Sequence, residues 1–157
     1  MKNKKWFIGT SGFMISQKNW LNQEQLNCIE INSSFYKTPT SNQIKKWLEF
    51  PKNIFFCLKV NKYITHLKKL KDIKEIWNEY WDKVKPLGKK LKCLLFQMSP
   101  SFIKNDMNVK RLHELKSKVK NIKCNIVFEF RNTSWFDNEI YNLFKKYNWT
   151  ISSTFIN

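Results

Sequence analysis

Three absences narrow the class of protein before any motif is considered. No apolar run approaches the roughly 20 residues that a membrane-spanning helix needs, so no membrane partner is expected. The basic start, MKNKKWFIGTSGF, breaks into Gly-Thr-Ser-Gly before a secretory apolar core can form, which favours a cytoplasmic location. The chain has only three glycines and lacks GxGxxG, the phosphate-binding loop of doubly wound dinucleotide-binding folds.

Cysteine and arginine are also scarce. The four cysteines, Cys28, Cys57, Cys93 and Cys124, lie far apart in the sequence and form no CxxC pair, which argues against a zinc site. We therefore expect reduced thiols packed in the fold, with Cys28, Cys57 and Cys93 buried. Of the 29 basic residues only Arg111 and Arg131 are arginines, and the rest are lysines.

The net charge of +17 raises the question of a nucleic-acid partner. The lysines fall mostly on expected helix faces, and neither an arginine cluster nor an alternation of aromatic and basic residues is present. A solvated basic surface is therefore the favoured interpretation, with a nucleic-acid footprint as the alternative. Binding through dispersed lysines would be non-specific and would weaken steeply with salt.

Length and composition predict one folded domain over residues 1–157. Hydrophobic residues make up 42% of the chain and aromatic residues 16%, which is enough for a real core. Short β-branched or aromatic runs alternate with amphipathic segments, a pattern typical of βα units and a parallel sheet. The strand candidates are Trp6–Gly9, Cys28–Asn32, Ile54–Val60, Leu91–Met98, Cys124–Phe130 and Trp149–Phe155.

Four amphipathic segments are predicted to be helices. The first lies around Trp47, between Pro39 and Pro51, and the second is a longer helix over residues 67–84. The third lies around Leu115, and the fourth is a helix around Phe144 that Asp137 is placed to cap.

The position of the polar residues in the strands favours an incomplete (β/α) barrel of the TIM type. Read with a period of two, Ile29 and Ile31 share one face of their strand, and Cys28 and Glu30 share the other. Four strands end in a polar residue on the face opposite their bulky apolar residues. We therefore expect Glu30 to point into a shared lumen and to contact Lys59 and Glu129, where barrels place their sites.

Several stretches also occur in a familiar order. They are Ile8-Gly9-Thr10-Ser11-Gly12-Phe13, Glu30-Ile31-Asn32-Ser33-Ser34-Phe35-Tyr36 with Pro39, Trp47 with Pro51, Lys59 with Ile64-Thr65-His66, Leu94-Leu95-Phe96-Gln97 with Pro100-Ser101-Phe102, and Glu129-Phe130-Arg131 with Ser134-Trp135. Together they closely resemble the YecE-like family, a widespread domain of unknown function. The resemblance covers almost the whole chain and implies a TIM-type barrel without implying an activity.

The sequence departs from the family pattern at two places. The stretch between Trp20 and Glu30 is shorter than in the family. After a sixth strand the chain also has no counterpart of the last two βα units, which carry a Tyr-x-Arg-x-His-Gly motif. We therefore expect a barrel of about six βα units out of eight, truncated at its C-terminus. An open edge of this kind predicts self-association, a complementing chain or poor solubility.

Ten residues are candidates for the site. Glu30, Lys59, His66 and Glu129 are the candidate catalytic residues, because carboxylates, an amine and an imidazole can transfer protons. The two carboxylates and the imidazole could also hold a divalent metal. A structural ion pair is the alternative for the two glutamates, charge balance of Glu30 is the alternative for Lys59, and local capping is the alternative for His66. For the aromatic candidates Tyr36 and Trp135, the alternative is packing in the core. The candidate substrate-binding residues are Ser11, Asn32, Tyr36, Gln97, Arg131 and Trp135.

Two classes of function remain open at this point. The first is a hydrolase or lyase that acts on a phosphate-bearing or nucleic-acid substrate, with Arg131 and Lys59 holding the anion. The second is a non-catalytic module that binds an anionic small molecule or RNA. An inactive remnant of a longer barrel is a further alternative.

Overall fold

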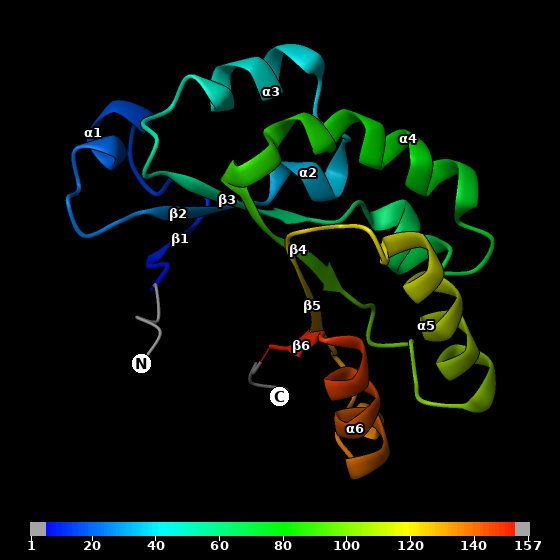
Figure 1. The fold of residues 1–157 in the computed structure, drawn as a ribbon. Helices are drawn as coiled ribbons and strands as arrows, with labels where there is room; N and C mark the ends of the chain where they lie inside the picture. The colour runs from blue at the N-terminus through cyan, green and yellow to red at the C-terminus, as the bar shows by residue number, and fades with distance from the viewer. Residues whose placement is uncertain (1–5, 153–157) are drawn as a thin grey trace.

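The computed structural model describes residues 6–152, in which six parallel strands alternate with helices (Figure 1). The sheet order follows the sequence from β1 to β6, so every strand pairs with the next one along the chain. Within the described residues β1 and β6 form the two edges, and the sheet is not closed. The strands are β1 (Gly9–Ser11), β2 (Cys28–Ile31), β3 (Phe55–Lys59), β4 (Leu91–Gln97), β5 (Asn125–Glu129) and β6 (Thr150–Ile151).

The helices cover one face of the curved sheet (Figure 1). No helix within residues 6–152 has both the length and the apolar character needed to cross a membrane. The α-helices are α1 (Gln17–Leu21), α2 (Ser33–Tyr36), α3 (Ser41–Leu48), α4 (Lys74–Val84), α5 (Asp106–Val119) and α6 (Asn138–Tyr147). Shorter helical segments are the π-helix η1 (Tyr63–Leu67) and the 3₁₀ helices η2 (Lys85–Lys90) and η3 (Thr133–Trp135).

The period-two prediction for the strands is confirmed. Ile29 and Ile31 of β2 are buried in the core beneath the helices, and Phe56 and Leu58 of β3 lie there too. Glu30 alternates with these residues and is only partly buried on the opposite face, which we call the inner face. An open parallel sheet with helices on its outer face is the predicted incomplete barrel.

Local sequence explains where most helices begin. Thr40 forms a capping box with Gln43 at the start of α3, and the Asp137 carboxylate accepts a hydrogen bond from the Ile140 amide at 2.9 Å. The predicted capping role of Asp137 is therefore confirmed. The helix expected over residues 67–84 begins only at Lys74. The backbone is left-handed at Lys69, Leu70 and Asp72, so the residues before Lys74 cannot continue the helix although their apolar spacing suggested one.

The first and last strands differ from the predicted ranges. Trp6–Gly9 was the expected first strand, but pairing with β2 begins at Gly9 and continues to Ser11. The apolar side chains that suggested a strand at residues 6–8 are exposed instead. For Trp149–Phe155, the structure has β6 only at Thr150–Ile151, and residues 153–157 lie outside the described part.

Lys90 ties the turn between α3 and β3 to the end of η2. Its Nζ donates to the carbonyl oxygens of Phe50 and Pro51, both at 2.8 Å, and lies 3.4 Å from that of Ile54. Lys90→Met is expected to lower the free energy of unfolding by about 2 kcal/mol, because these carbonyls lose a charged donor. Urea denaturation measures the effect, and Lys89→Met, at an exposed neighbour, is the control. Equal midpoints for the two variants would contradict this role of Lys90.

Candidate functional site

Polar side chains stand at the C-terminal ends of four neighbouring strands. Glu30 pairs in register with Cys57, two residues before Lys59, and Lys59 pairs with Leu95, two residues before Gln97. Gln97 then pairs directly with Glu129. In a barrel of this type, neighbouring strands are shifted along each other by about one residue per strand. Residues on successive strands that are offset by such a shift therefore lie at the same height along the barrel axis. The four side chains therefore form one rim, on which parallel barrels build their sites.

At one end of the rim, Ser11, Glu30 and Asn32 form a hydrogen-bonded group. The Ser11 hydroxyl donates to Glu30 Oε1 at 2.8 Å, and Asn32 Nδ2 donates to Ser11 Oγ at 3.0 Å. Gly12 makes this turn possible with a φ of +81°, and its amide donates to the Glu30 carbonyl oxygen at 2.9 Å. A hollow of about 310 Å³ borders Glu30 and Asn32. Glu30 thus holds the Ser11 hydroxyl and itself borders an open space.

At the other end, Glu129 joins Gln97 and Arg131. Gln97 Nε2 donates to Glu129 Oε1 at 2.8 Å, and Arg131 Nη2 forms an ion pair with the same oxygen. The Glu129 side chain is 13% exposed, so its charge is largely shielded from water. Arg131 Nε is buried and has no hydrogen-bond partner within residues 6–152. The guanidinium therefore has an unused donor next to a carboxylate that is already paired.

Lys59 and His66 both contact the ring of Phe35. Lys59 Nζ lies 4.9 Å from the centroid of the Phe35 ring, and the His66 ring packs against Phe35 edge to face at 4.9 Å. Burial lowers the pKa of His66 below its usual range, and the positive charge of Lys59 lowers it further. Among the described residues, Lys59 forms no ion pair with a carboxylate. The result is a neutral imidazole close to an unneutralised ammonium group.

The segment that carries His66 has an unusual backbone. His66 belongs to the π-helix η1, and the buried Thr65 hydroxyl lies 3.0 Å from His66 Nδ1. Departures of this kind from the α-helix occur often at functional sites. After the left-handed turn that follows, Arg111 donates to the Lys69 carbonyl oxygen at 3.3 Å. Arg111, one of the two arginines, therefore supports this segment from α5.

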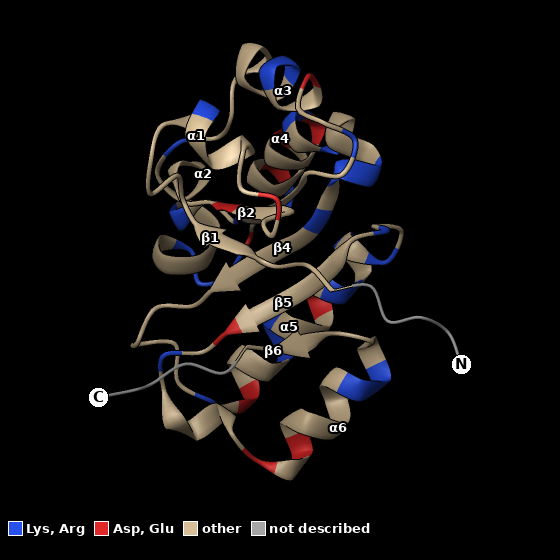
Figure 2. Cartoon of the chain, turned by 90° about the vertical axis from the view of Figure 1, so that its left-hand side faces the viewer, with Lys and Arg blue, Asp and Glu red and all other residues tan. Residues whose placement is uncertain are grey.

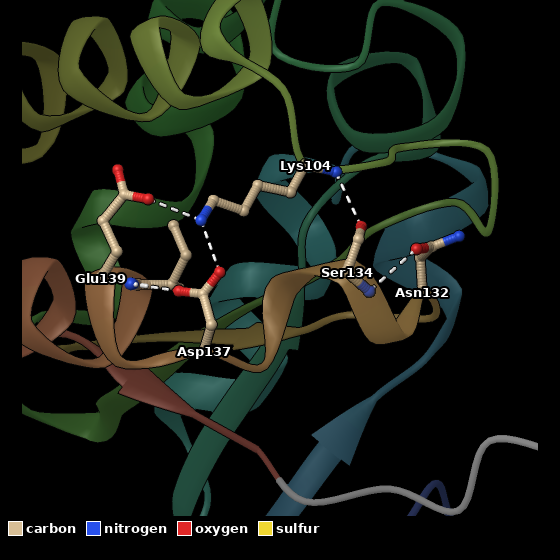
Figure 3. Close-up of polar contacts among 6 residues, drawn as sticks. Lys104, Asn132, Ser134, Asp137 and Glu139 are labelled. Carbon is tan, nitrogen blue, oxygen red and sulfur yellow. Dashed lines mark hydrogen bonds and ion pairs between the residues drawn. The ribbon is translucent and has the colours of Figure 1, made fainter.

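Lys104 fixes the loop after β5 that leads away from Arg131. Its Nζ contacts the carboxylates of Asp137 and Glu139, and its backbone amide donates to Ser134 Oγ at 2.8 Å (Figure 3). These contacts join the β4–α5 loop to the start of α6. No local sequence signal marks Lys104, because its partners lie 30 or more residues away.

The structure separates some residues that the sequence analysis grouped. Within residues 6–152 no hydrogen bond or ion pair joins Glu30, Lys59 and Glu129, so the expected mutual contact is not formed. The sheet is open and the three side chains project from different strands. Glu30 is bonded to Ser11 and Glu129 to Gln97, whereas Lys59 lies over the Phe35 ring. Trp135, expected at the site, is fully buried in the core, with its indole N–H on the Phe102 carbonyl oxygen at 2.5 Å.

The cysteines are free, as predicted, but each is only partly buried. Burial raises the pKa of Cys28 to about 11 and that of Cys124 to about 12. A hydrogen bond with the Cys93 thiol and burial raise the pKa of Cys57 as well. Among the described residues, no three histidine, cysteine or acidic side chains lie close enough together to hold a metal ion. The divalent metal considered from the sequence therefore has no such ligand group within residues 6–152.

The open parallel sheet, its helical outer layer and its polar rim define a TIM-barrel-like α/β protein. The family model described as "Protein of unknown function DUF72" matches residues 14–154, and the chain belongs to this family. The name YecE refers to the same family, so the resemblance noted in the sequence is confirmed.

Solved structures of the family share the fold. A DUF72 family protein from Thermotoga maritima superposes with a TM-score of 0.72 at 26% identity, covering 85% of this chain and 52% of that one. One from Enterococcus faecalis gives a TM-score of 0.71 at 23% identity, covering 87% and 59%. UPF0759 protein YunF of Bacillus subtilis is 28% identical over 72% of this chain and 42% of its own length. The chain spans about half the length of these relatives.

Proposed function

We propose that the rim binds a phosphate-bearing substrate and that His66 acts there as the general base of a hydrolase or lyase. The observation that carries this proposal is that Lys59 and His66 both contact the Phe35 ring. An ammonium group without a carboxylate partner attracts an anion, and the same charge favours the neutral imidazole. A neutral imidazole at pH 7 can accept a proton from a bound substrate or from water.

Arg131 supports the same proposal from the neighbouring strands. Its guanidinium is planar and presents several donors, a geometry that suits the oxygens of phosphate or carboxylate groups. One of its nitrogens already contacts Glu129, which also accepts a hydrogen bond from Gln97, and the Arg131 side chain is 39% exposed and so open to a ligand. In this proposal Glu129 and Gln97 position Arg131 and do not react themselves.

Ser11 and Glu30 have a second role in the proposal. The Ser11 hydroxyl points to the Glu30 carboxylate and is held by Asn32, so a substrate hydroxyl or a water molecule in the adjacent hollow can exchange protons with Glu30. The chain spans about half the length of the relatives it matches, and the roles proposed here concern the residues of this chain alone. The present chain supplies the anion-binding side chains and the candidate base.

Histidine NMR tests the anion site directly, because the chain has only His66 and His113. We expect inorganic phosphate to raise the pKa of His66 above its value in chloride at equal ionic strength, since a bound anion stabilises the imidazolium. Lys59→Met is expected to raise the pKa of His66 in chloride and to abolish the additional effect of phosphate. The measurement is a pH titration of the imidazole resonances in both salts.

His113 is an internal control because it lies on α5 and contacts Tyr147 instead of the rim. At one pH, the chemical shifts of its ring protons should be the same in phosphate and in chloride. If phosphate leaves the pKa of His66 unchanged, or if Lys59→Met responds to phosphate like the wild type, the anion site is wrong.

The non-catalytic alternative uses the same anion contacts and differs at His66. A His66→Gln variant should still bind phosphate-bearing ligands in either case, because the cationic groups remain. Only the enzyme hypothesis requires the loss of turnover, so binding and turnover measured on this variant separate the two.

A further inference from the structure

A groove of about 660 Å³ opens beside the rim, between the segments that follow β2 and β3. Two tyrosines line it, one from each segment: Tyr36 is 67% exposed and Tyr63 is 52% exposed. Exposed aromatic side chains that share one groove are unusual, because burial of an aromatic ring stabilises a fold more than exposure does.

The groove is held by a buried polar residue. Asn61 is 6% exposed; its Nδ2 lies 3.4 Å from Thr38 Oγ1, and its Oδ1 accepts a hydrogen bond from the Tyr63 amide at 2.8 Å. These contacts join the two segments that carry the tyrosines. The groove is therefore preformed, which lowers the entropic cost of binding a ligand there.

The charges around the groove favour an anionic ligand. Lys37 and Lys83 line it, and Lys62 Nζ lies 5.7 Å from the centroid of the Tyr36 ring. Glu79 is the acidic residue in the lining. Lysines and arginines are spread over the helices and loops of the whole molecule, so positive charge alone does not distinguish this place (Figure 2). The combination of lysines with two exposed aromatic rings distinguishes the groove from the rest of the surface.

The groove adjoins the proposed anion site through one ring. Phe35 packs edge to face against Tyr36 at 5.1 Å, and the same ring contacts His66 and lies beneath the Lys59 ammonium. A ligand whose planar groups lie in the groove can therefore extend a phosphate towards Lys59. Aromatic faces next to cationic groups, repeated at the spacing of a chain, are the recognition chemistry of single-stranded nucleic acid.

We propose that the groove of Tyr36 and Tyr63 binds single-stranded nucleic acid by stacking its bases, and that the lysines contact its phosphates. The inference rests on the proposed function in one respect, since it identifies the phosphate-bearing substrate of the rim as a nucleic-acid strand. Base stacking does not require a particular base, so the preference is for single strands in general.

The experiment compares two fluorescent ten-nucleotide strands, oligo-dT and an abasic strand with the same phosphates and no bases. Fluorescence anisotropy at physiological salt measures their affinities for the wild-type chain. We expect tighter binding of oligo-dT, and we expect Tyr36→Ala combined with Tyr63→Ala to weaken it by about fivefold or more, the effect of losing one stacked base. The affinity for the abasic strand should change little in the double variant.

Two control variants separate stacking from other effects. Replacement of both tyrosines by phenylalanine keeps the rings and should keep the preference for oligo-dT. Tyr141→Ala removes a tyrosine that is 40% exposed on α6, away from the groove, and should leave both affinities unchanged. Equal affinity of the wild type for the two strands, or an unaltered preference in the double alanine variant, would overturn the inference. A phosphate-dependent pKa of His66 would then still support the anion site by itself.

Discussion

Trp135→Ala is expected to lower the free energy of unfolding by about 4 kcal/mol, the middle of the range for truncating a buried aromatic residue. The Trp135 ring is fully buried and lies between Phe102, at a centroid distance of 5.0 Å, and Phe130, at 4.6 Å. Both contacts are stacked, and Phe130 continues the stack to Phe128. Truncation would leave a cavity inside this column and would orphan the Phe102 carbonyl oxygen.

Guanidinium denaturation followed by far-UV circular dichroism measures the loss. Trp135→Phe keeps an aromatic ring without the indole N–H and should cost about 1–2 kcal/mol. Trp6→Ala removes a tryptophan that is 74% exposed and should stay within about 0.5 kcal/mol of the wild type. If Trp135→Ala were as mild as Trp6→Ala, the aromatic column would not contribute to stability as described.

Trp135 also shows why the sequence analysis misplaced one site residue. It stands beside Arg131 in a motif, so a role at the site was a reasonable expectation. Its burial depends on Phe102, which lies 33 residues earlier and follows a different strand. Contacts between separate βα units are set by the packing of the whole layer, and no local period in the sequence records them.

Glu30 shows what could be predicted. The alternation of Ile29 and Ile31 with Glu30 places the carboxylate on the inner face, and the structure agrees. Its hydrogen-bond partner could not be predicted, because a partner depends on the register between strands. The register of β1 and β2 places Ser11 opposite Glu30. On β3, the residue opposite Glu30 is Cys57, and Lys59 lies two residues further along that strand. The strand stagger is a property of the pairing between neighbouring strands and not of either strand alone.

The register at β1 depends on Gly9, and Gly9→Ala is expected to detach this strand. Gly9 pairs with Cys28, and a Cβ at position 9 would lie 1.6 Å from the Cys28 carbonyl oxygen. The obstacle is backbone, which cannot move without breaking the ladder between β1 and β2. We expect a loss of about 3 kcal/mol, the upper part of the range for overpacking, together with the loss of the Ser11–Glu30 hydrogen bond.

Hydrogen exchange distinguishes this local effect from general unfolding. The amides of β1 and its contacts with β2 should lose protection in Gly9→Ala, while those of β4 and β5, which pair with each other, keep theirs. Gly88→Ala is the matched control, because a Cβ there meets nothing within 4 Å and only the φ of +51° opposes it. That strain should cost about 1–2 kcal/mol without changing exchange in β1. Protection of β1 that survives in Gly9→Ala would show that the strand can shift, and the position of Ser11 at the rim would no longer follow from the pairing of Gly9 with Cys28.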